Sequence, residues 1–154
     1  MYKKTIVYED FNEMQRTQNF YFYLSKVKLT KLNASVEGGI QEKFEKIVNK
    51  FDVNGLIDVV DKLIRYSYGE KSDDGLRFIQ SDALSEEFAQ TNAYEVLFME
   101  LINDPDTLAD FIRKVLPRDL QEKIDEEMAK GNIPNIVPAD EKKEAKVLEI
   151  RKSE

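Results

Sequence analysis

The sequence predicts a mostly helical α+β fold, in which an N-terminal two-stranded β-hairpin packs on a compact bundle of short helices. Residues 2–24 are rich in β-branched and aromatic side chains, as strands are. From residue 25 to residue 130, apolar residues recur at helical spacing. Beyond Gly131, prolines and a dense run of charges replace this pattern. We therefore expect one globular domain over residues 1–130 and a flexible charged tail or linker over 131–154.

The composition limits the classes of function open to the chain. It has 154 residues, a formal net charge of −7, and no histidine, cysteine or tryptophan. For this chain alone, that excludes histidine-dependent catalysis, imidazole or thiolate metal sites, and disulfides. The acidic balance opposes binding to nucleic acid, and no apolar run approaches the roughly 20 residues of a membrane helix. We expect a non-enzymatic protein without cofactor or metal, which binds other proteins.

The predicted hairpin has strands at residues 2–10 and 16–24, joined by a turn around Asn12. Side chains alternate across a strand, so Tyr21 and Tyr23 share the face opposite Phe20. Both faces are aromatic, and a lone hairpin is marginal in water. Two interpretations stay open: the hairpin lies on the helices with its tyrosines partly exposed, or its second face meets another subunit. The second interpretation makes Phe20, Tyr21 and Tyr23 candidates for self-association.

Start and stop signals divide the rest of the body into helices. The apolar stripes lie around residues 26–37, 44–51, 56–68, 82–89, 92–103, 105–116 and 118–130. Ser25, Ser81 (or Asp82) and Asp104 are typical N-caps. Gly69 is expected to cap the C-terminus of the central core helix. Ser72 to Gly75 predicts a turn within an excursion over residues 70–80.

The last helix carries a narrow apolar line. Leu120, Ile124 and Met128 follow one another at a strict spacing of four, and charged residues lie beside them. Such a helix is either lightly docked at the end of the domain or seeks a groove on a partner. Both interpretations remain open at this point.

Nothing in the sequence supports a metal or catalytic site. If Gly75 took the invariant glycine position of a calcium loop, Ser81 would stand where a bidentate glutamate is required. A carboxylate-based hydrolase would need two acidic residues to converge in a deep pocket, and no spacing brings two together. The positive signal is aromatic: nine phenylalanines and seven tyrosines exceed what one small core is expected to hide.

Three stretches stand out, in order over residues 2 to about 116. They read YKKTIVYEDF followed by FYFYL, then SYGEKS with DG and RFI, and then FAQT with AY and LFMEL. None of them is a catalytic motif. Together they resemble the tail assembly chaperones of long-tailed, siphovirus-type phages and prophages of Gram-positive bacteria.

The resemblance implies a non-enzymatic chaperone that binds the tape-measure protein, keeps it soluble and helps the tail-tube protein assemble around it. It implies action in the bacterial host cytoplasm during assembly, and absence from the mature virion. We expect a homo-oligomer, because covering a long apolar helix takes many copies. Candidate residues for contact with this client are Tyr94, Phe98, Leu120, Ile124 and Met128. An alternative function is a soluble adaptor or inhibitor that acts on a host protein.

Overall fold

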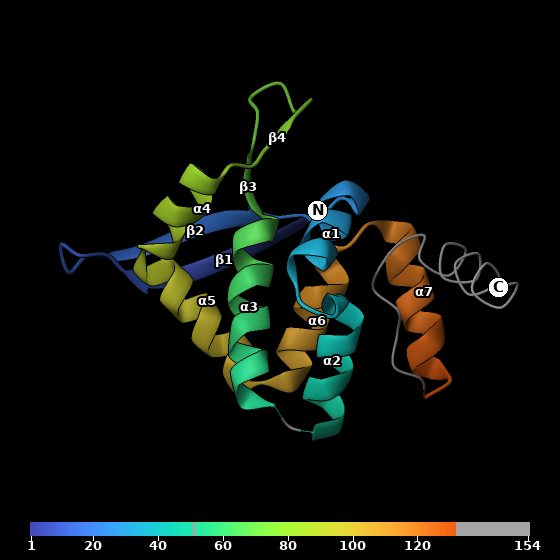
Figure 1. Cartoon of the computed structure of the whole chain (residues 1–154). Coiled ribbons are helices and arrows are strands. Elements are labelled where there is room, and N and C mark those ends of the chain that lie inside the picture. Colours follow the sequence, from blue (N-terminus) through green and yellow to red (C-terminus); the bar gives the residue numbers. More distant parts are fainter. Residues whose placement is uncertain (51, 132–154) are drawn as a thin grey trace, which may run out of the picture.

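The chain begins with the hairpin that the sequence predicts (Figure 1). The structure is a computed structural model that describes residues 1–50 and 52–131. Strand β1 (Tyr2–Glu9) pairs antiparallel with β2 (Gln15–Phe22), in the register that places Tyr2 opposite Phe22. The Asp10 carboxylate shapes the turn by accepting hydrogen bonds from two backbone N–H groups, at 2.8 Å from Asn12 and 3.0 Å from Met14. The hairpin prediction is therefore confirmed.

The sheet is larger than the predicted two strands. Strands β3 (Tyr68–Lys71) and β4 (Phe78–Ile79) extend it to four antiparallel strands in the order β1-β2-β3-β4. The predicted turn lies between them, where the Gly75 N–H donates to the Ser72 carbonyl oxygen at 2.9 Å. These two strands have four and two residues, which is too short for a period-two pattern to show in the sequence.

Seven helices follow the predicted order within the described residues (Figure 1). They are α1 (Lys26–Ser35), α2 (Gly39–Lys50), α3 (Val53–Ser67), α4 (Asp82–Ala89), α5 (Asn92–Asn103), α6 (Pro105–Val115) and α7 (Arg118–Ala129). The predicted caps are confirmed: the Ser25 and Ser81 hydroxyls each accept a backbone N–H bond at 3.1 Å, and the Asp104 carboxylate accepts one at the same distance. The mostly α, α+β fold class is confirmed.

The predicted capping role of Gly69 is wrong. Helix α3 ends at Ser67 and its C-cap is Tyr68, which already has extended backbone. Gly69 lies inside β3, where a Cβ atom would come within 2.8 Å of the Ile79 carbonyl oxygen and 2.6 Å of the Phe78 ring. The glycine is therefore needed for the close approach of β3 to β4, and not for a left-handed cap.

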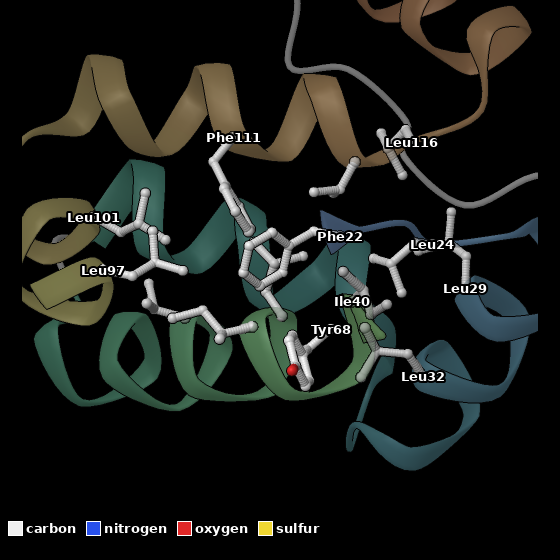
Figure 2. Packing of buried hydrophobic residues seen from close by; sticks show 14 of the residues in the cluster. Phe22, Leu24, Leu29, Leu32, Ile40, Tyr68, Leu97, Leu101, Phe111 and Leu116 are labelled. Carbon is white, nitrogen blue, oxygen red and sulfur yellow. The ribbon is translucent and has the colours of Figure 1, made fainter. Parts of the chain in front are cut away.

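The core lies between the inner face of the sheet and the helices. Phe22 is fully buried, and its side chain lies beside that of Phe111 in the core (Figure 2). The Phe22 ring centroid lies 5.3 Å from that of Phe111 and 5.9 Å from that of Phe88. Along β1 the exposed and buried positions alternate, with Ile6 inward at 2% exposure and Val7 outward at 51%. The sheet thus has an inner face toward the helices and an outer face toward solvent.

Ring-on-ring packing absorbs most of the aromatic surplus that the composition predicts. Among the described residues, Phe11 is the only aromatic side chain in the exposed class, and the other described rings are buried or half-buried. Tyr68 and Phe88 stack with their centroids 4.3 Å apart. The side chains of Phe44, Ile47 and Val48, all of Phe51, and the predicted tail from residue 132 onward lie outside the described part.

Candidate functional site

The outer face of the sheet presents the two tyrosines that the sequence singles out. Tyr21 lies opposite Lys3 in the ladder, and the Lys71 ammonium lies 5.4 Å from the centroid of the Tyr21 ring. The Tyr23 ring meets the edge of Phe78 at a centroid distance of 6.2 Å. Both tyrosines are half-buried. The arrangement gives this face an aromatic centre with cations beside it.

Phe20 does not belong to this surface. It points to the inner face, where its centroid lies 5.1 Å from that of Phe88 and 6.2 Å from that of Tyr8. The structure therefore separates Phe20 from Tyr21 and Tyr23, as the alternation of side chains along β2 requires.

Tyr94 and Phe98 form a second aromatic pair, on α5 beside α3. Their rings stack with centroids 5.8 Å apart. The Tyr94 hydroxyl donates a hydrogen bond to the Asp61 carboxylate, and burial together with this carboxylate raises the pKa of Tyr94 to about 12. Arg65 donates to Asp61 at 2.9 Å and to Glu86 at 2.8 Å, which ties α3 to α4. Both rings are half-buried.

The three candidates on α7 are placed differently. Leu120 and Ile124 are each 4% exposed and belong to the buried core cluster. The side chain of Met128 lies outside the described residues. Leu120 and Ile124 are therefore covered by the chain itself.

An apolar cavity of about 40 Å³ lies between α1, α2, α3 and α6. Nine of its ten lining residues are apolar, and the tenth is Lys62. The lining residues are Leu24, Leu29, Leu32, Val36, Ile40, Val59, Lys62, Leu63, Ile112 and Leu116. Several of them gather at one end of the core (Figure 2).

Sequence reasoning missed this cavity. Its walls come from segments up to 92 positions apart, from Leu24 to Leu116, and the nine apolar wall residues are part of ordinary apolar patterns in those segments. No spacing within one segment marks such a site, because it exists only where four helices meet imperfectly. A cavity with this lining suits an aliphatic side chain from a partner.

Two further observations bear on the kind of site. Within the ranges that the structure describes, no group of three acidic residues is placed to hold a metal ion. In the same ranges, no helix has both the length and the apolar character needed to cross a bilayer.

Comparison with known proteins gives one match. A family model described as "Phage tail assembly chaperone" matches residues 1–154. No curated protein and no solved structure matches the chain.

Proposed function

This chain belongs to the phage tail assembly chaperone family, and we propose that it binds the tape-measure protein and keeps it soluble while the tail tube assembles. The observation that carries the proposal is the family match over the whole chain. On this proposal, the tail-tube protein is a second partner, and the chain acts in the host cytoplasm without entering the virion. The host is a Gram-positive bacterium, and the chain has no catalytic role.

The apolar cavity supports this function. A tape-measure helix offers aliphatic side chains along its length, and a small cavity between helices can accept one of them. The Lys62 ammonium lies 3.4 Å from the Asp58 carboxylate, so the one charged lining residue of the cavity forms an ion pair within the chain. The aromatic pair of Tyr94 and Phe98 adds a second contact on α5. Modest contacts of this kind permit release, and many copies along one client supply the avidity.

The outer face of the sheet supports self-association. Tyr21 and Tyr23 combine aromatic area with adjacent cations, and aromatic residues are enriched at the centres of interfaces. The segments of the fold also differ in charge. Residues 1–35 hold six Lys and Arg against three Asp and Glu, whereas residues 81–117 hold two against eight. Some of this opposite charge is already paired within the chain, as in Lys4 with Glu100 at 2.9 Å, and the remainder can favour contact between copies.

A cavity-filling variant tests the client site. Val59→Phe places a larger apolar side chain in the existing space, which leaves the fold intact when the cavity accommodates it. Co-expression with a tape-measure fragment that is insoluble alone should then yield about tenfold less soluble fragment than the wild type does. The readout is the amount of fragment in the cleared lysate, with circular dichroism of the purified variant as the test of folding.

Val53→Phe is the matched control, because Val53 lies on the same helix but is 62% exposed and outside the cavity. It should solubilise the fragment as the wild type does. If wild-type chain leaves the fragment insoluble, the proposed function is wrong. If Val59→Phe folds and solubilises as well as Val53→Phe, the cavity is not the client site.

A further inference from the structure

Helix α7 is attached to the body by few side chains. Among its described side chains, only Leu120 and Ile124 are buried, and the rest are exposed or half-buried. These two residues are one helical turn apart on the same face. We use the name α7 seat for the part of the buried core cluster that Leu120 and Ile124 cover. It lies beside α1 and α6, at the edge of the body (Figure 1).

The polar contacts of α7 with other helices are exposed. Asp119 pairs with Lys26 of α1, and both side chains are more than half exposed. Asp125 accepts two hydrogen bonds from Arg113 of α6, at 2.7 and 3.1 Å, and these two side chains are about half exposed. An exposed single ion pair such as Lys26–Asp119 contributes little to stability, so the bidentate Arg113–Asp125 pair is the stronger of the two polar contacts that hold α7.

The connection between α6 and α7 interrupts the helical backbone, and across it the Gln121 side-chain amide of α7 donates to the Leu116 carbonyl oxygen at 2.6 Å. Leu116 has extended backbone (φ −81°, ψ 156°), and Pro117 follows it without an N–H group to continue the helical ladder. The body beside this joint is fixed independently, because the Leu24 N–H donates to the Val115 carbonyl oxygen at 2.8 Å. This hydrogen bond involves no residue of α7.

We propose that α7 is an internal ligand, and that its seat also binds a tape-measure helix that presents two aliphatic side chains four residues apart. This proposal rests on the proposed function and adds how binding and release of the client are regulated. In the free chain α7 covers the seat and keeps apolar surface out of water. A client helix with a wider apolar stripe displaces α7, and α7 returns when the client is released into the growing tail. The seat accepts this class of helix because it already holds one.

Cross-linking tests the exchange in the full-length chain. The sequence has no cysteine, so Arg113→Cys with Asp125→Cys gives a single thiol pair that a short bis-maleimide can join across α6 and α7. The matched control joins Lys4→Cys to Glu100→Cys, which replaces a 2.9 Å ion pair between β1 and α5. The probe is a fluorescent peptide from an apolar helix of the tape-measure protein, and the readout is its anisotropy.

The cross-linked α6–α7 variant should bind the peptide at least tenfold more weakly than the same variant before cross-linking. The cross-linked control should bind as the wild type does. Equal binding before and after cross-linking of α6 to α7 overturns the exchange and leaves the proposed function standing. Absence of binding by the wild type overturns both.

Ile124→Ala provides a second test. Competition of α7 with the client and direct contact of Ile124 with the client predict opposite changes in peptide affinity. If α7 competes with the client, Ile124→Ala weakens the competitor and should tighten peptide binding several-fold. If Ile124 contacts the client directly, as the sequence suggests, the same change weakens binding. Weaker or unchanged binding by a folded Ile124→Ala variant therefore contradicts the exchange.

Discussion

The side-chain amide nitrogen of Gln80 lies 3.0 Å from the carbonyl oxygen of Tyr23, a residue 57 positions earlier in the chain. The same nitrogen lies 3.1 Å from the Tyr66 carbonyl oxygen and 3.0 Å from that of Ser67. Its two hydrogens are thus shared among carbonyl groups at the end of β2 and the end of α3. Through this one amide, Gln80 joins the outer sheet face to the central helix.

Removing the amide of Gln80 should destabilise the fold. Gln80→Met keeps the length of the side chain but removes the Gln80 donor from the Tyr23 and Tyr66 carbonyl oxygens, whereas the Ser67 carbonyl oxygen keeps the Tyr23 N–H at 2.8 Å. This should lower the free energy of unfolding by about 1–3 kcal/mol. Gln18→Met is the control, because Gln18 accepts its hydrogen bond from Tyr8 at an exposed site. Urea denaturation followed by circular dichroism measures both. Equal losses in the two variants would show that Gln80 has no special role.

The Asp104 cap should make α6 sensitive to acid. Hydrogen bonds from the Thr107 hydroxyl and the Asp106 N–H lower the pKa of Asp104 below its ordinary value of 3.8. A carboxylate whose pKa is lowered by folding adds stability above the ordinary pKa, and this stability is lost as the pH falls through the lowered value.

The thermal midpoint of Asp104→Asn should therefore fall less than that of the wild type between about pH 5 and pH 2.5. Asparagine caps a helix equally well and does not titrate. Asp106→Asn, in the same first turn, should leave the contribution of the Asp104 cap to the thermal midpoint unchanged. Thermal scans at a series of pH values compare the variants. If the thermal midpoint of Asp104→Asn falls with pH as steeply as that of the wild type, the cap does not have this role.

Charge on the outer sheet face should reduce self-association. Tyr21→Glu with Tyr23→Glu places two carboxylates where the proposed interface has its aromatic centre, which opposes burial against a second copy. Light scattering should give a smaller mass, while helicity stays at the wild-type value. Ala34→Glu on the exposed side of α1 is the control and should leave the mass unchanged. An unchanged mass for the double variant would remove this face from the interface.

The elements with a strong local pattern could be predicted from the sequence. Helix α5 has the predicted bounds, Asn92 to Asn103, and the turn from Ser72 to Gly75 is where its residue types place it. The hairpin was predictable because β-branched and aromatic residues mark both strands. Gly69 was misread because a glycine after a helix is more often a cap than a point of close strand approach.

The candidate sites depended on contacts between distant segments, which the sequence pattern does not reveal. Tyr94 reaches Asp61 across 33 positions, so its hydroxyl is already occupied. The spacing of Leu120 and Ile124 predicted an apolar line, but not whether the chain itself or a partner covers it. The structure places both side chains in the core, and this placement suggests the exchange of α7 with a client.

Native mass spectrometry of a co-expressed pair shows whether this chain holds the tape-measure protein. We expect complexes in which several 17.9 kDa chains accompany one tape-measure chain. The Val59→Phe variant should give fewer such complexes than Val53→Phe. If the two proteins appear only as separate species, with the wild-type chain folded and in excess, this chain does not bind the tape-measure protein.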